Sequence, residues 1–238
     1  VVWEGPADQP IVGGVFDDVT AQRAKEIIAR YPQSRSALLP LLHLVQSVEG
    51  HVSQDGIRFC ADALELTTAE VAAVVTLYKR TPCGEHLVSV CPNTLCAALG
   101  GDAIYRRLQE KLGSADEPLG HEKTSADGVL TLEHAECVAA CDFGPVIQVN
   151  YEFYDNQDVD TAEQLVDALR WGEKPHPTRG APLTDFRTVE LESSGIFPDR
   201  ARAERSARAF SCPCQPSHAP LRHFFASPLS KSLPGAEL

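Results

Sequence analysis

The chain has 238 residues, of which 43% are hydrophobic and 23% are charged, and its formal net charge is −12. This length predicts one or two domains with enough apolar side chains to build cores. An acidic chain without a basic stripe is not typical of a nucleic-acid-binding protein. No apolar run reaches the roughly 18 residues of a membrane span, and no signal peptide is visible, so we expect a cytoplasmic protein without membrane insertion.

Composition and periodicity divide the chain into four parts. Residues 1–18 are expected to form an arm punctuated by Pro and Gly, and residues 19–80 a bundle of amphipathic helices. Residues 84–172 are expected to form an α/β domain, one sheet with two helices. Residues 173–238 are rich in proline and predict an extended or disordered tail. The predicted fold class is therefore α+β.

The predicted bundle contains four short helices. Their predicted first residues are Thr20, Ser36, Asp55 and Thr67. Thr67 and Glu70 have the spacing of a capping box, and Gly50 should end the second helix. His43 and His51 occur singly, so we expect them to be surface or core residues rather than metal ligands.

The predicted α/β domain alternates strands and helices. The predicted strands cover residues 87–90, 129–132, 146–149 and 151–154, and the predicted helices cover residues 95–112 and 161–171. The last two strands should form a hairpin over Asn150. Thr161 should begin the last helix with a second capping box.

Two pairs of cysteines stand where predicted strands of this domain run out into loops. Cys91 and Cys96 have C-x4-C spacing, and Cys137 and Cys141 have C-x3-C spacing. Four thiolates can bind either a zinc ion or a [2Fe–2S] cluster. Structural disulfides or scattered core cysteines are the other interpretation, but metal-ligand spacing without a secretion signal favours a metal site.

The remaining cysteines are not predicted to bind metal. Cys60 lies on a predicted helix face and is expected to act as a small buried hydrophobe, and Cys83 lies in the linker. Cys212 and Cys214 form a motif too short to assign. A thioredoxin-like thiol oxidoreductase would carry a C-x-x-C motif, which the sequence lacks.

The cysteine pairs and their surroundings resemble a known family. The residues that carry the likeness are Ser89-Val90-Cys91, Cys96, Glu136-Cys137 and Cys141-Asp142-Phe143-Gly144-Pro145-Val146. They are similar to the thioredoxin-like [2Fe–2S] ferredoxins. With the helical bundle in front, they are more similar to the small [2Fe–2S] subunit of the NADH-oxidising module of respiratory complex I. Related subunits occur in NAD-reducing hydrogenases and formate dehydrogenases. The likeness covers about residues 15–175.

The resemblance implies that Cys91, Cys96, Cys137 and Cys141 bind one [2Fe–2S] cluster, and that the chain has no catalytic residue of its own. The chain would belong to an NADH:quinone oxidoreductase, in the peripheral arm at the cytoplasmic face of the inner membrane. It would dock on a flavoprotein subunit that holds FMN and the NADH site, beside other peripheral-arm subunits, and its cluster would exchange electrons with FMN.

Several features remain open on the sequence alone. A zinc-stapled interaction module, or the equivalent subunit of an NAD-linked hydrogenase or formate dehydrogenase, stays an alternative. The family often has Gly where Ala139 stands, and residues 75–82 are shorter than the family pattern. Asp142 should oppose reduction of the cluster, because its charge adjoins Cys141. We also predict that residues 19–80 clamp the flavoprotein, because their apolar faces exceed what four helices need for one another.

Overall fold

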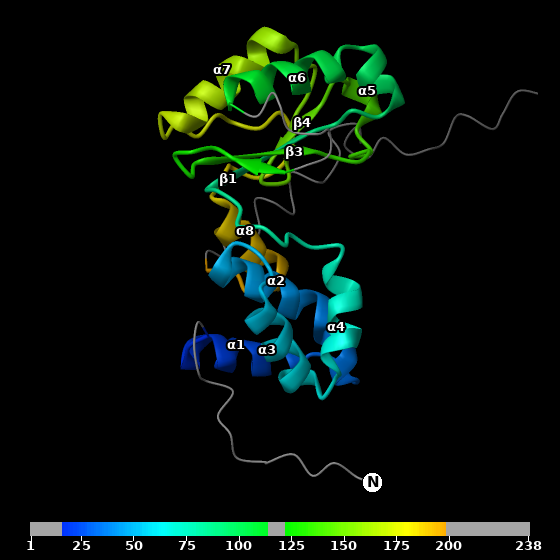
Figure 1. Ribbon diagram of the computed structural model, residues 1–238, viewed down its shortest axis with the longest axis vertical. Helices are drawn as coiled ribbons and strands as arrows, with labels where there is room; N and C mark the ends of the chain where they lie inside the picture. The colour runs from blue at the N-terminus through cyan, green and yellow to red at the C-terminus, as the bar shows by residue number, and fades with distance from the viewer. Residues whose placement is uncertain (1–15, 114–121, 199–238) are drawn as a thin grey trace, which may run out of the picture.

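The computed structural model describes residues 16–113 and 122–198 of the chain. Figure 1 shows helices α1 to α4 and α8 in the lower part, and a sheet covered by further helices in the upper part. The predicted α+β fold class, with helices preceding an α/β unit, is confirmed. Most of the predicted arm, and the predicted tail from residue 199 onward with Cys212 and Cys214, lie outside the described residues.

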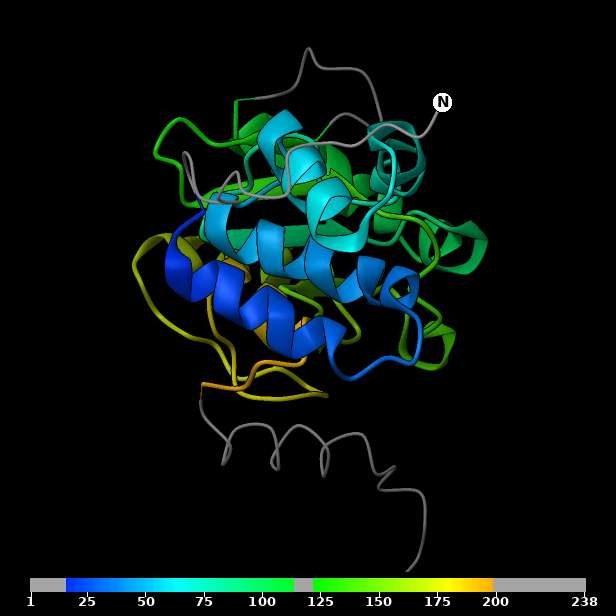
Figure 2. The ribbon, with the colours of Figure 1, turned by 90° about the horizontal axis from the view of Figure 1, so that it is seen from below.

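The helical bundle is built on one apolar core. Its elements are α1 (Asp18–Ile28), a 3-10 turn (Ser34–Ala37), α2 (Leu38–Glu49), α3 (Gln54–Leu64) and α4 (Thr68–Val75). Leu41, Leu42 and Val45 of α2 are fully buried in this core. Figure 2 shows α1 and α2 side by side when the molecule is seen from below. The predicted grouping of the apolar faces therefore agrees with the packing.

The helix ends follow capping chemistry, with some corrections to the prediction. Thr67 and Glu70 form the predicted capping box, and Gly50 ends α2 with φ +78°. Three predicted starts were misplaced. Asp17 rather than Thr20 caps α1, Ser53 rather than Asp55 caps α3, and a 3-10 turn rather than a Ser36 cap precedes α2. Asp17 and Ser53 are the better caps because their side chains accept the backbone N–H three residues on.

The upper unit is a five-stranded sheet in the order β2-β3-β1-β4-β5. Its elements are β1 (His86–Val90), α5 (Thr94–Ala98), α6 (Gly101–Lys111), β2 (Lys123–Thr124), β3 (Leu130–His134), β4 (Ile147–Val149), β5 (Glu152–Tyr154) and α7 (Val159–Arg170). β1 and β3 are parallel, and the other pairs are antiparallel. α6 and α7 cover one face of the sheet (Figure 1). β1, the central strand, is buried along its whole length.

Three details of this unit differ from the prediction. The single helix expected over residues 95–112 is two helices, which separate at Gly100 with φ +111°. The two-residue strand β2 is too short to leave a periodic signal. α7 begins at a capping box of Asp158 and Thr161, so Thr161 is the third helical residue rather than the cap. The hairpin over Asn150 is confirmed.

Helix α8 (Phe186–Ser193) lies inside the segment that was predicted to be an extended or disordered tail. Asp185 caps it by accepting from the backbone N–H of Thr188, and Phe186 is fully buried. α8 packs on α2, and Figure 1 shows it between α2 and the sheet. It thus covers part of the bundle face that we had assigned to a partner. None of the described helices is both long and apolar enough to cross a membrane.

Candidate metal centre

The four predicted ligands gather at one edge of the sheet. Cys91 follows β1 directly, and Cys137 follows the end of β3 by three residues. Because β1 and β3 are parallel, both strands release their loops at the same edge. The pairing continues beyond the strands, since the backbone N–H of Ala135 donates to the carbonyl of Val90 at 3.0 Å. The topology therefore brings the two cysteine loops together, as the sequence predicted.

The first cysteine loop, residues 91–96, is buried and tightly built. The side chains of Cys91 and Cys96 are 1% and 2% exposed. The backbone N–H of Cys91 donates to the carbonyl of Val146 at 3.2 Å. A Cβ on Gly101 would stand 2.7 Å from the carbonyl oxygen of Cys91 and 2.9 Å from that of Cys96. Only glycine fits there, so the start of α6 fixes the backbone of both cysteines.

The second cysteine loop, residues 137–141, is exposed. Cys137 and Cys141 both lie at the surface, and Cys141 begins a short 3-10 turn, Cys141–Phe143. Ala139 has φ +57°, a left-handed conformation that favours glycine. This gives a physical reason for the glycine that the family often has at this position. The departure at Ala139 is accommodated by the fold at a cost in local strain.

The thiols lie pairwise and influence one another. Burial and a hydrogen bond with Cys91 raise the pKa of Cys96 to about 11. A hydrogen bond with Cys137 raises the pKa of Cys141, and the charge of Cys91 adds to this rise. The sulfur atoms of both loops are therefore close enough to interact electrostatically. A metal centre here must displace thiol protons, because thiolates rather than thiols bind metal.

A third segment, residues 144–146, lies against the first loop. A Cβ on Gly144 would stand 3.2 Å from the sulfur of Cys96, so the chain passes the sulfur with little space to spare. The backbone N–H of Val146 hydrogen-bonds the Cys96 sulfur and opposes the rise of its pKa. Backbone N–H groups directed at sulfur are the hydrogen bonds that tune iron–sulfur centres.

The donor set fits a two-iron cluster. Among residues 16–113 and 122–198, no three His, Cys, Asp or Glu side chains are grouped as the ligands of one ion would be. The cysteines stand instead as two pairs. A [2Fe–2S] cluster takes four cysteine ligands, two on each of its irons. Cys91 with Cys96, and Cys137 with Cys141, would supply those pairs.

The other residues weighed from the sequence have structural surroundings. Cys60 is fully buried in the bundle core, and burial raises its pKa to about 12. Burial likewise raises the pKa of Cys83 to about 12. His43 lies 2.6 Å from the buried carboxylate of Glu190 on α8. His51 contacts the carbonyl of Glu49.

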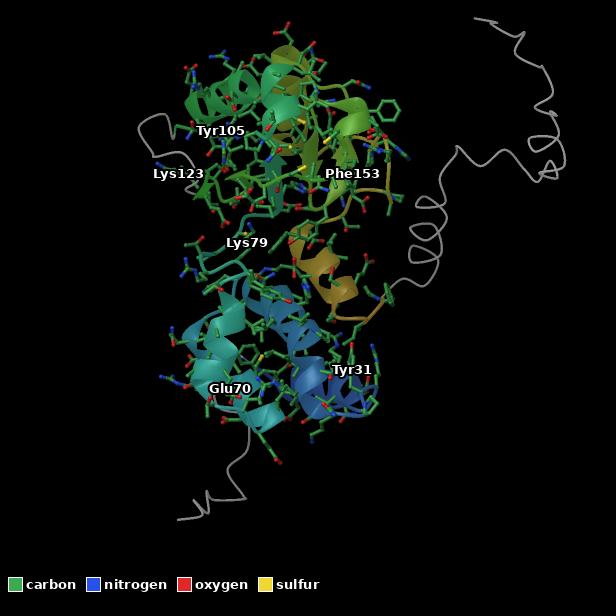
Figure 3. The ribbon with its side chains drawn as sticks, turned by 90° about the vertical axis from the view of Figure 1, so that its right-hand side faces the viewer. Tyr31, Glu70, Lys79, Tyr105, Lys123 and Phe153 are labelled. Carbon is green, nitrogen blue, oxygen red and sulfur yellow. The ribbon has the colours of Figure 1, made fainter. Side chains whose placement is uncertain are left out.

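Arg179, beside the second cysteine loop, was not found from the sequence. Its guanidinium lies 3.3 Å from the carboxylate of Asp142, the neighbour of Cys141. It also lies over the ring of Phe153, which Figure 3 labels in the upper unit. Arg179 stands in the predicted tail, beyond the residues that carry the family likeness. The only signal that could have indicated it is an arginine amid residues otherwise rich in proline.

Comparison with known proteins agrees with this geometry. A family model described as thioredoxin-like [2Fe-2S] ferredoxin matches residues 24–170. The chain belongs to this family. One of the named subunits of the NADH-quinone oxidoreductase of Mycobacterium tuberculosis is 56% identical over 180 residues, which cover 74% of this chain and 69% of that protein. The protein of the same name from Rickettsia bellii is 34% identical over 161 residues, covering 65% of this chain and 93% of that one.

A solved structure gives a weaker likeness. The chain resembles part of an NAD+-reducing [NiFe]-hydrogenase in the H2-reduced state, with 17% identity and a TM-score of 0.47. The match covers 55% of this chain but only 22% of the hydrogenase chain, so it identifies neither the fold nor the function. Membership of the ferredoxin family, and the likeness to the oxidoreductase subunits, confirm the resemblance seen in the sequence.

Proposed function

We propose that this ferredoxin-family chain binds one [2Fe–2S] cluster and is an electron-transfer subunit of an NADH:quinone oxidoreductase. Cys91 and Cys96 would hold one iron, and Cys137 and Cys141 the other. The observation that carries the proposal is the meeting of the two cysteine pairs at the ends of parallel strands β1 and β3. The bound cluster would supply one-electron transfer. The chain itself orients the thiolates, directs the Val146 N–H at sulfur and excludes water from the first loop.

The metal content tests this proposal against the zinc alternative. The full chain, produced with iron–sulfur assembly machinery, should contain about two iron and two acid-labile sulfide per chain and be coloured. One zinc per chain, with no sulfide and no visible absorbance, would contradict the proposal and indicate a zinc-stapled module instead.

We propose further that the cluster exchanges electrons with FMN in a partner flavoprotein subunit, at the cytoplasmic face of the membrane. The sequence has no G-x-G-x-x-G fingerprint for a dinucleotide, so the NADH site is assigned to the partner. The isolated chain should therefore not reduce ferricyanide with NADH. Turnover by the chain alone would contradict this division of labour.

Exposed apolar side chains support docking at two places. Leu95, Leu99 and Phe143 are exposed around the cysteine loops. Leu39 and Leu77, 52% and 82% exposed, line a cavity of about 300 Å³ beside Lys79. Figure 3 shows Lys79 between the bundle and the upper unit. Such exposed apolar groups commonly mark protein interfaces.

Paired substitutions separate the two docking places. If the bundle is the anchor, Leu39→Ser with Leu77→Ser should weaken copurification with the flavoprotein at least about tenfold. The matched pair Leu95→Ser with Leu99→Ser should weaken it less. The opposite order would mean that the cysteine loops, rather than residues 19–80, hold the partner.

A further inference from the structure

Residues 178–181 run beside β5, the edge strand of the sheet. The backbone N–H of Phe153 donates to the carbonyl of Arg179 at 3.1 Å, and that of Thr178 donates to the carbonyl of Phe153 at 2.9 Å. The backbone N–H of Ala181 donates to the carboxylate of Glu152 at 2.7 Å. This segment lies beyond residue 170, where the family match ends. It carries Arg179 back to the second cysteine loop.

The side chain of Arg179 is held by two carboxylates and two rings. One guanidinium nitrogen lies 3.3 Å from Asp142, and another lies 2.6 Å from Asp155. The guanidinium carbon is 5.3 Å from the ring centre of Phe143 and 5.1 Å from that of Phe153. Planar stacking combined with forked hydrogen bonds is a role that lysine cannot fully replace. Arg179 therefore ties the turn after Cys141 to the sheet edge.

The charges around Arg179 bear on a cluster at Cys141. Reduction adds one negative charge, so nearby positive charge favours the reduced state and negative charge opposes it. Asp142 adjoins Cys141 and would oppose reduction if it were unpaired. Arg179 pairs with both Asp142 and Asp155, so the three groups together carry one net negative charge instead of two.

We propose that Arg179 is a positioning residue of the iron–sulfur site: it fixes the turn Cys141–Phe143 and keeps the reduction potential above the value that Asp142 would otherwise impose. This inference rests on the proposed function. It assigns a role to a residue outside the matched family region. Arg179 acts through its charge and through the loop geometry, and it is not a ligand.

Redox titration of the full, cluster-loaded chain by EPR tests the proposal. Arg179→Gln should assemble the cluster and shift its potential to more negative values. We expect a threefold to tenfold fall in the equilibrium constant for one-electron reduction, where tenfold corresponds to about 59 mV. Arg179→Lys should recover most of the shift, since it keeps the charge. Lys111→Gln is the matched control, because Lys111 forms a comparable ion pair with Asp167 between α6 and α7.

Asp142→Asn keeps the test decisive if Arg179→Gln fails to hold a cluster. It should shift the potential to more positive values, and the double variant should return close to the wild-type potential. Equal potentials in wild type, Arg179→Gln and Asp142→Asn would overturn the proposal, as would an equal shift in Lys111→Gln. If the wild-type chain takes up no iron and sulfide, the proposed function fails instead, and the two failures are thereby distinguished.

Discussion

The two cysteine loops differ in how the fold holds them. The first loop, residues 91–96, is buried, hydrogen-bonded to the carbonyl of Val146 and packed against Gly101. The second loop, residues 137–141, is exposed and contains a strained alanine at position 139. Backbone packing thus shapes the first loop. The turn that follows the second loop depends on side-chain contacts with Arg179.

This difference suggests a division of roles within one site. A buried, pre-shaped pair of thiols can accept an iron with little rearrangement and shield it from water. An exposed pair leaves its iron near the surface, where a redox partner can approach. The comparison predicts that substitutions under the first loop act mainly on stability and cluster retention. Substitutions around the second loop should act mainly on access and potential.

The largest effect is expected at Gly101. Gly101→Ala places a Cβ against two backbone carbonyls that cannot move independently, so we expect about 2–3 kcal/mol of lost stability. Bound iron should fall as well. Urea unfolding and iron analysis measure both effects. Gly113→Ala is the control, because Gly113 has φ +72° but open space around it, and its cost of about 1 kcal/mol is conformational only. Equal costs at the two glycines would contradict the packing argument.

Thiol alkylation should separate the loops by rate. In the chain without metal, iodoacetamide at pH 8 should modify Cys137 and Cys141 at least about tenfold faster than Cys91 and Cys96, because thiolate fraction and access control the rate. Cys96, with a pKa of about 11, stays protonated at pH 8, and its rate should rise with pH up to that value.

Peptide mass spectrometry reads this order of modification, and Cys60 serves as the slow internal reference. Its thiol is fully buried, and its pKa is raised to about 12. Equal rates for the two pairs would mean that the first loop opens as readily as the second. The distinction between a pre-shaped and an exposed pair would then be lost.

The smallest effect is expected at Ala139. Ala139→Gly removes the strain of φ +57°, although glycine loses more backbone entropy on folding, so we expect a net gain of about 0.5–1 kcal/mol. The matched control is Ala135→Gly, since Ala135 is not among the residues with positive φ and its replacement should destabilise. Chemical unfolding compares them. A loss of stability in Ala139→Gly would show that the loop is not strained there.

Much of the fold could be read from local sequence signals. The capping box at Thr67, the turn at Asn150 and Gly50 act within a few residues, so pattern analysis found them. Helix α8 escaped because most of its stability comes from packing on α2, far away in sequence, and proline-rich flanks hide it. The break at Gly100 escaped because apolar residues continue at helical spacing across it.

The candidate site was predictable in its ligands but not in its surroundings. Cysteine spacing, together with the family resemblance, selected all four ligands. Gly101 and Arg179 became visible only in three dimensions. Gly101 matters through the approach of two carbonyls, and Arg179 through a chain segment that returns to the sheet edge. Neither contact leaves a periodic or motif-like signal in the sequence.

The central claim is that Cys91, Cys96, Cys137 and Cys141 together bind one cluster. Its most direct test is the EPR signal of the reduced chain in single Cys→Ser variants, with iron measured on the same samples. Replacing any of the four should abolish or strongly alter the signal. Cys60→Ser and Cys83→Ser, at the two other described cysteines, should leave its shape and its integrated intensity per iron unchanged. An unchanged signal in any of the four variants, or loss of the signal on replacing Cys83, would contradict the assignment.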